Sequence, residues 1–263
     1  MLEESASMDP VVRRYIGRDG VQLAYRELGE GRPLILLPGF GATSRSMIDL
    51  GPGRALAERG HRVIATDPRG NGHSARDLAP TAYRPDVLVD DGLALVEHLG
   101  LDDYDLSGYS LGARVALRMM VCGALPARAV LAGQDLNVVT RPYDPNSRHR
   151  RMMATLAANH PLDTSQPNTT ENTHRLAEAD IDPQALVHVF DSLVPTTHEE
   201  LTRIEPPTLV VIGADDERRP GGPDLAQALP HGRFAEIPGD HARAISTPEL
   251  VELTHAFLTQ GHP

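Results

Sequence analysis

Short apolar runs alternate with helix-like segments along most of the chain. At the start, VVRRYI and VQLAYREL flank Gly17-Arg18-Asp19-Gly20, and the Asp-Gly pair predicts the turn of a β-hairpin. Beyond it, strands buried on both faces are predicted from the apolar runs PLILLPG, HRVIATD, DYDLSG, RAVLAG and PTLVVIG, and RFAEIPG predicts a last strand. The chain therefore contains eight strand-like segments.

Helical periodicity fills much of the sequence between these runs. The clearest helix follows Pro85 and can end at Gly100, with apolar residues three or four apart at Val89, Leu93, Val96 and Leu99. A last helix is predicted to open at Thr247-Pro248. Right-handed crossovers with helices on both faces bury such strands, so the pattern predicts an α/β fold with a doubly wound, mostly parallel, eight-stranded sheet.

The stretch from residue 134 to 205 differs from the rest, with more polar residues, scattered prolines and the basic run Arg148-His149-Arg150-Arg151. Asp182-Pro183 is a plausible helix start, and Thr197 with Glu200 can form a capping box. We therefore predict a core of residues 1–133 and 206–263, interrupted by a helical lid insertion of residues 134–205.

Composition narrows the class of partner. Among 263 residues, 25 Lys and Arg stand against 36 Asp and Glu, a formal net charge of −11, which disfavours nucleic acid and anionic membranes and favours a small-molecule substrate. The single cysteine, Cys122, allows no intrachain disulfide, and we expect it to be a small buried residue. No bilayer-spanning run and no signal peptide are recognisable, so we expect a cytoplasmic protein. The expected assembly state is a monomer or a homodimer.

The candidate chemistry begins at Gly108-Tyr109-Ser110-Leu111-Gly112, which fits the pattern G-x-S-x-G. The motif lies between a strand-like run and the helix-like ARVALRMM, the context in which a sharp turn lifts a serine above the end of a strand. Bulk on either side of that turn would collide with the neighbouring strand and helix, which explains the two glycines. Ser110 is therefore the candidate nucleophile.

A serine hydroxyl needs a base to take its proton and a carboxylate to orient that base. The base should follow a strand immediately and come late in the chain, and His241, directly after RFAEIPGD, satisfies both conditions among the 12 histidines. The carboxylate should end the preceding strand, where Asp215, Asp216 and Glu217 are all available. Spacing alone does not choose among these three.

Two backbone N–H groups are needed to stabilise the negative charge that develops on the attacked carbonyl oxygen. Leu111, the residue after the nucleophile, supplies one. The loop in LLPGFGATS supplies the other, and Phe40 sits where its amide could face the serine. No HExxH or comparable ligand spacing occurs, so neither a metal nor a cofactor is expected.

With these segments in place, the chain resembles the α/β-hydrolase family over nearly all of its length outside the insertion. The resemblance rests on PGFG, on DPRGNGHS from Asp67, on GYSLG, on Gly213-x-x-Asp216 after a strand, and on the GDH that ends at His241. It favours Asp216 as the acid and implies that DPRGNGHS, with Asp67, Arg69 and His73, mostly shapes a loop. The chain departs from the family in having Pro38-Gly39 where His-Gly is frequent, and Ala113 where a second glycine is frequent.

The expected activity is acyl transfer to water, with hydrolysis of a carboxylic ester or lactone as the first choice. A serine nucleophile disfavours the family's haloalkane dehalogenase and epoxide hydrolase branches, which attack through aspartate. Three alternatives stay open. They are carbon–carbon hydrolysis of a diketone-type compound, a ligand-binding member that turns over slowly or not at all, and a non-hydrolytic member with peroxide-dependent or cyclisation chemistry.

Overall fold

A computed structural model describes residues 10–76, 79–158, 176 and 180–260. Eight strands form one sheet in the order β1-β2-β4-β3-β5-β6-β7-β8. All eight strand-like segments of the sequence are strands: β1 Val11–Ile16, β2 Gln22–Leu28, β3 Arg32–Leu37, β4 His61–Asp67, β5 Asp105–Tyr109, β6 Arg128–Ala132, β7 Thr208–Gly213 and β8 Gly232–Ile237. The predicted doubly wound fold class is confirmed.

The sheet is antiparallel at one edge and parallel elsewhere. β1 pairs with β2 as a hairpin, with Val11 opposite Glu27, and β2 pairs antiparallel with β4. From β4 through β3 to β8 every pairing is parallel. Gly20 has a φ of 83°, so the predicted Asp-Gly turn uses the glycine where positive φ is required. Because β3 to β8 run in the same direction, their carboxyl ends meet at one rim of the sheet.

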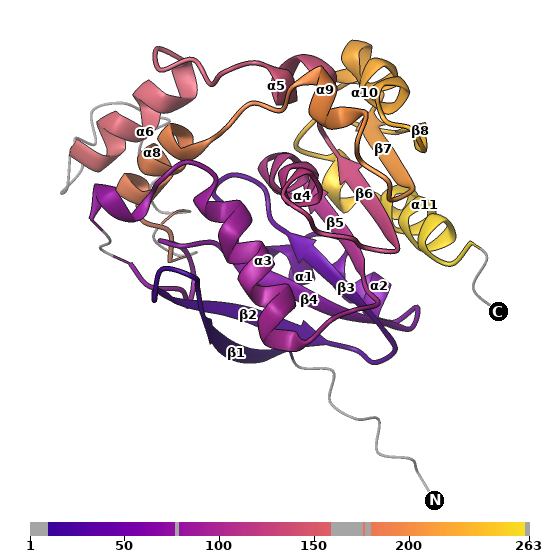
Figure 1. Cartoon of the computed structure of the whole chain (residues 1–263), viewed down its shortest axis with the longest axis horizontal. Coiled ribbons are helices and arrows are strands. Elements are labelled where there is room, and N and C mark those ends of the chain that lie inside the picture. Colours follow the sequence, from indigo (N-terminus) through magenta and orange to yellow (C-terminus); the bar gives the residue numbers. More distant parts are fainter. Residues whose placement is uncertain (1–9, 77–78, 159–175, 177–179, 261–263) are drawn as a thin grey trace, which may run out of the picture.

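Helices cover both faces of the sheet, with α3 and α4 in front of it and α1 and α2 behind it in Figure 1. The helices are α1 Ser44–Asp49, α2 Gly53–Ala57, α3 Val87–Leu99, α4 Leu111–Val121, α5 Leu136–Thr140, α6 Arg148–Ala158, α8 Pro183–Ser192, α9 His198–Leu201, α10 Gly222–Ala228 and α11 Pro248–Leu258. Short 3-10 turns are η1 Pro80–Ala82, η2 Arg219–Gly221 and η3 Ala244–Ser246.

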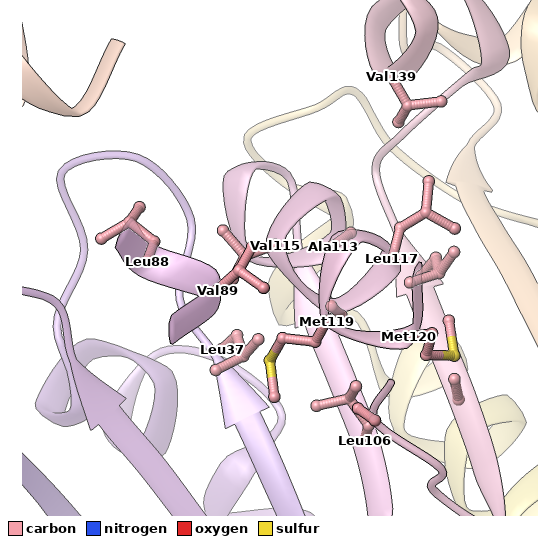
Figure 2. Packing of buried hydrophobic residues seen from close by; sticks show 14 of the residues in the cluster. Leu37, Leu88, Val89, Leu106, Ala113, Val115, Leu117, Met119, Met120 and Val139 are labelled. Atoms are coloured by element: carbon pink, nitrogen blue, oxygen red, sulfur yellow. The ribbon is translucent and has the colours of Figure 1, made fainter. Parts of the chain in front are cut away.

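The core is divided by the alternation of side chains along each strand. In β3, Ile35 and Leu37 belong to the cluster under α3, α4 and α10, whereas Leu34 and Leu36 belong to the cluster under α1, α2 and α11. Figure 2 shows Val115 and Met119 of α4 among side chains of α3 and β3. Because both faces of β3 are buried, its continuous apolar run in the sequence is explained.

The buried stripe of α3 differs from the one expected from apolar spacing. Leu93 and Val96 are only half-buried, whereas Leu88 and Leu95 are buried. The buried face also includes Asp91 and Gly92, two residues that a search for apolar periodicity passes over. A methyl group at residue 92 would overlap the Met119 side chain, so the glycine allows α3 to pack closely on α4.

Helices also occupy the described part of residues 134–205, where α5, α6, α8 and α9 lie. Two predicted helix starts are confirmed. Asp182 accepts a hydrogen bond from the Gln184 amide at 2.8 Å, with Pro183 as the first helical residue, and Thr197 and Glu200 form a capping box. The division of the chain at residues 133 and 206 stays a prediction.

The expectation for Cys122 is wrong. The residue is the C-cap of α4 and is exposed, because it lies just past the last helical residue, Val121. Its surroundings still raise the pKa of the thiol, mainly by partial burial of the sulfur, which disfavours the reactive thiolate. None of the described helices is both long and apolar enough to cross a bilayer.

A buried histidine makes the stability of the fold depend on pH. His61 is 3% exposed, its Nε2 lies 3.0 Å from Nδ1 of His255, and burial lowers its pKa to about 4. The unfolded chain takes up this proton near pH 6.5 and the folded chain does not, so stability is lost as pH falls from 6.5 towards 4. We expect a loss of up to about 3 kcal/mol in the free energy of unfolding, measured by urea denaturation.

The matched variants are His61→Gln, which removes the buried imidazole, and His198→Gln, which removes an exposed one. The first should flatten the dependence of unfolding free energy on pH between 6.5 and 5, and the second should leave it unchanged. Equal slopes in wild type and His61→Gln would contradict the assignment.

Candidate active site

The loop between β5 and α4 forces Ser110 into an unusual backbone conformation, with φ 53° and ψ −114°. This region is sparsely populated for residues other than glycine, and such strain is typical of functional positions. A side chain at Gly108 would overlap the backbone of Gly112, and one at Gly112 would overlap the carbonyl group of Leu37. The predicted steric need for both glycines is therefore confirmed, and the turn presents Ser110 at the carboxyl rim of the sheet.

Three predicted site residues from distant parts of the polypeptide are linked in series by hydrogen bonds. His241 Nε2 lies 2.9 Å from Ser110 Oγ, and His241 Nδ1 lies 2.6 Å from Oδ2 of Asp216. The carboxylate accepts from Nδ1–H, which leaves the Nε2 lone pair for the serine hydroxyl. Each residue follows a parallel strand, since Ser110 directly follows β5, Asp216 follows β7 and His241 follows β8.

The structure separates the three candidate acids that the sequence left open. Asp216 is buried, and its side chain has no exposed surface, whereas Asp215 and Glu217 are exposed. Asp216 also accepts a hydrogen bond at Oδ1 from the Arg218 amide at 3.0 Å. Only Asp216, of the three, contacts His241. Its geometry agrees with the choice that the family resemblance favoured.

The surroundings of His241 favour the neutral imidazole. Partial burial is the main cause that lowers its pKa below 6.5, and the positive charge of Arg218 acts in the same direction. Asp216 opposes both effects through its charge and its hydrogen bond. A neutral imidazole at pH 7 can accept a proton, which is the state that a general base requires.

Several residues that the sequence analysis missed hold Ser110 and His241 in place. Tyr109 donates its hydroxyl to the His241 backbone carbonyl at 2.6 Å, and Gln134 Nε2 donates to the Ser110 carbonyl at 2.8 Å. Gly133, with φ 68°, leaves room for the imidazole, because a methyl group there would lie 3.1 Å from its Cε1. Tyr109 lies inside the G-x-S-x-G motif and Gly133 directly follows β6, but only the fold shows that both face His241.

The predicted oxyanion loop lies against the serine turn. A methyl group at Gly39 would come within 3.7 Å of Ser110 Cβ and 3.5 Å of the Tyr109 carbonyl oxygen. Within the part of the chain that the structure describes, the amides of Phe40 and Leu111 donate no hydrogen bond. Both N–H groups therefore remain available for a ligand beside Ser110.

The segment DPRGNGHS contributes to the scaffold. Asp67 accepts hydrogen bonds from the amides of Ser44 at 2.7 Å and His73 at 3.0 Å, which ties the loop after β4 to the start of α1. The Arg69 guanidinium is fully buried, with Nε 2.8 Å from Asp91 of α3 and Nη1 2.9 Å from Asp19 of the hairpin turn. These contacts agree with the structural reading of the motif.

Metal ligands are not assembled at this rim. Among residues 10–76, 79–158, 176 and 180–260, no group of three His, Cys, Asp or Glu side chains is arranged to hold an ion. The hydrogen-bonded serine, histidine and aspartate are therefore the chemistry that the described site offers.

The fold recurs in known proteins. Residues 32–121, from β3 to the end of α4, match the family model described as alpha/beta hydrolase fold. A thermophilic esterase from Thermogutta terrifontis has the same fold, with a TM-score of 0.72 over 97% of this chain and 100% of its own, at 23% identity. The chain therefore has the alpha/beta hydrolase fold.

The chain is similar to the non-heme chloroperoxidase CPO-A1 of Kitasatospora aureofaciens, at 35% identity over 95 residues. That match covers 36% of this chain and 33% of the chloroperoxidase, so the chain spans about a third of this relative. A putative non-heme bromoperoxidase, BpoC, from Mycobacterium tuberculosis is 25% identical over 88% of this chain and 95% of its own length.

Arg218 should influence the basicity of the His241 imidazole. Replacing Arg218 with glutamine removes a positive charge that lowers the pKa of His241, so we expect that pKa to rise. The measurement is an NMR titration of the imidazole in wild type and variant. Arg243→Gln is the matched control, because Arg243 is close in sequence and its side chain is 84% exposed. An unchanged pKa in Arg218→Gln would show that the charge of Arg218 does not act on the imidazole.

Proposed function

We propose that this protein is a serine hydrolase that cleaves a small-molecule carboxylic ester or lactone through an acyl-enzyme. The observation that carries the proposal is the hydrogen-bonded chain Ser110–His241–Asp216, with 2.9 Å and 2.6 Å between successive partners. Ser110 and the His241 side chain are both partly exposed, so a small molecule can reach them. An esterase fold neighbour supports the choice of an ester.

In the acylation half-reaction, Ser110 Oγ attacks the substrate carbonyl carbon while His241 Nε2 takes the hydroxyl proton. The buried Asp216 carboxylate stabilises the imidazolium that forms. The tetrahedral oxyanion accepts hydrogen bonds from the Phe40 and Leu111 amides. His241 then returns the proton to the leaving alkoxide, which departs as an alcohol and leaves the acyl group on Ser110.

Deacylation repeats these steps with water. His241, again neutral, takes a proton from a water molecule that attacks the acyl carbonyl, and the same two amides hold the second oxyanion. Collapse of this intermediate breaks the bond to Ser110 Oγ, which regains a proton from His241. The carboxylic acid is released and the starting site is restored. For a lactone, the alcohol and the acid are two ends of one product.

We assign the acyl group to an apolar class because of the side chains on the insertion side of the oxyanion loop. Leu186 of α8 and Met153 of α6 belong to one apolar cluster, against which Phe40 packs. A roof of this kind contributes dispersion contacts and few polar ones, which suits a moderately apolar acyl chain. On this proposal, residues 134–205 act as the lid and set substrate choice.

Perhydrolysis is a second candidate, favoured by the names of two relatives, a non-heme chloroperoxidase and a putative non-heme bromoperoxidase. In this reaction hydrogen peroxide replaces water and attacks the acyl-Ser110, giving a peracid and free serine. The peracid then oxidises a halide outside the site. Addition of peroxide and bromide to the ester assay should yield a halogenated phenol-type dye product that Ser110→Ala does not form.

Substitutions in the hydrogen-bonded chain should abolish ester hydrolysis. With p-nitrophenyl esters of increasing acyl length, Ser110→Ala or His241→Ala should lower kcat by on the order of 10⁴ to 10⁶. Asp216→Asn should depress kcat severely, because the imidazolium loses its buried counter-charge. Asp215→Asn is the matched control and should retain activity, since Asp215 is exposed.

A serine-directed fluorophosphonate tests the nucleophile independently of substrate choice, and mass spectrometry should find the label on Ser110. A wild-type protein that hydrolyses no ester of the panel and leaves Ser110 unlabelled would contradict the proposal and favour a ligand-binding role. A labelled Ser110 with turnover only of diketone-type compounds would instead favour carbon–carbon hydrolysis.

A further inference from the structure

Three aromatic rings form a stack that runs from the oxyanion loop into the insertion. The Phe40 ring stacks on Phe190 of α8, with centroids 4.3 Å apart and an interplanar angle of 24°. Tyr143, just before α6, stacks on Phe190 with centroids 4.2 Å apart and an angle of 5°. The whole chain has only 4 Phe, 6 Tyr and no Trp, so this stack gathers a large share of its aromatic side chains in one place.

Contacts of the Phe40 ring can fix the orientation of the backbone amide of the same residue. Phe40 lies between Gly39 and Gly41, and Gly41 has a φ of 64°. Glycines on both sides give this short loop many accessible backbone conformations, and they offer no side chain with which to restrict them. Packing of the Phe40 ring therefore has a direct effect on where the amide at residue 40 points.

Phe190 is attached to the core through both ends of α8. At the start of the helix, the Asp182 amide donates to the Gly70 carbonyl at 3.1 Å, in the loop after β4. At its end, the Asp86 amide donates to the Ser192 carbonyl at 3.0 Å, at the start of α3. These hydrogen bonds join α8 to the rim of the sheet. The Phe190 ring, on which the Phe40 ring stacks, is therefore held in a fixed position.

The outer ring of the stack is held as well. The Tyr143 hydroxyl lies 2.6 Å from Ser147 Oγ, and Ser147 Oγ accepts from the Arg150 amide at 3.2 Å at the start of α6. Arg150 in turn forms two hydrogen bonds with the Asp191 carboxylate, at 3.1 Å and 3.0 Å. Asp191 directly follows Phe190, so α6 and α8 are clamped together beside the stack.

We propose that Phe190, supported by Tyr143, is a positioning residue that holds the Phe40 amide in the orientation in which it stabilises the oxyanion. This inference rests on the proposed function, since an oxyanion forms only if Ser110 attacks a carbonyl. Phe190 acts through Phe40 and touches no reacting atom. Hydrogen-bond donors fixed in advance at the developing charge contribute strongly to catalysis, and small displacements of them reduce the rate.

The test uses Phe190→Leu, which removes the ring and keeps an apolar side chain in its place. We expect kcat on the best p-nitrophenyl ester to fall about tenfold, with KM within about twofold of wild type. The inhibition constant of a phenylboronic acid, which forms a tetrahedral anionic adduct with Ser110, should rise by a similar factor. Tyr143→Leu should shift kcat and the inhibition constant in the same direction by less.

The control is Phe257→Leu, which removes another buried phenylalanine ring on α11. It should leave kcat, KM and the inhibition constant unchanged in the folded fraction, determined by active-site titration. A wild-type kcat and inhibition constant in both Phe190→Leu and Tyr143→Leu would overturn the inference, and so would a change confined to KM, which would make Phe190 a wall of the substrate pocket. If Phe190→Leu does not fold, Tyr143→Leu decides alone. Failure of wild type to react at Ser110 would instead remove the proposed function.

Discussion

Backbone contact between β3 and the start of α4 is the constraint on which the site depends. A side chain at Gly112 would collide with the Leu37 carbonyl group, and a side chain at Gly108 would collide with the backbone of Gly112 in the first turn of α4. Only this closeness lets the chain reverse at Ser110 within a few residues of a fully buried strand. The strain at a serine φ of 53° persists because packing on both sides determines the backbone there. A looser turn would leave the hydroxyl at a different height above the sheet, out of line with a histidine fixed on another strand.

The helix that follows the serine is held by charged groups as well as by its apolar side. Arg118 of α4 pairs with Asp86 before α3 and with Glu200 of α9, and the two ion pairs connect three segments across the top of the core. Arg114, one turn after Ser110, is buried and donates to the backbone carbonyls of residues 138, 141 and 194. Because these segments lead into and out of residues 141–193, α4 supports both the serine turn that precedes it and the two ends of that part of the chain.

Sequence patterns were sufficient for the strands and for the fold class, because β3 to β8 are short strand-like runs that alternate with helix-like segments. A motif and a position after the last strand singled out Ser110 and His241 in the sequence, and the structure brings these two side chains within 2.9 Å of each other. The same patterns left Asp215, Asp216 and Glu217 unresolved, because the choice depends on which side chain the end of β7 turns inward, and adjacent residues there differ only in burial. Tyr109, Gly133 and Arg218 escaped detection for a similar reason. Each acts on His241 from another strand end, and that proximity exists only after the sheet has assembled.

In the proposed ester hydrolysis, the charges around His241 meet the opposite requirements of two stages. Before attack the imidazole must be neutral, and burial together with Arg218 disfavours its protonated form. During attack it must become an imidazolium, and the fully buried Asp216 carboxylate, 2.6 Å away, is the group that stabilises this charge. Arg218 contacts the same carboxylate, with Nη1 3.6 Å from Oδ1, on the oxygen that does not face His241. Oδ2 of Asp216 thus contacts His241, whereas Oδ1 contacts the guanidinium group and the backbone amide of Arg218. This division keeps the carboxylate oriented in both stages while the charge on its partner changes.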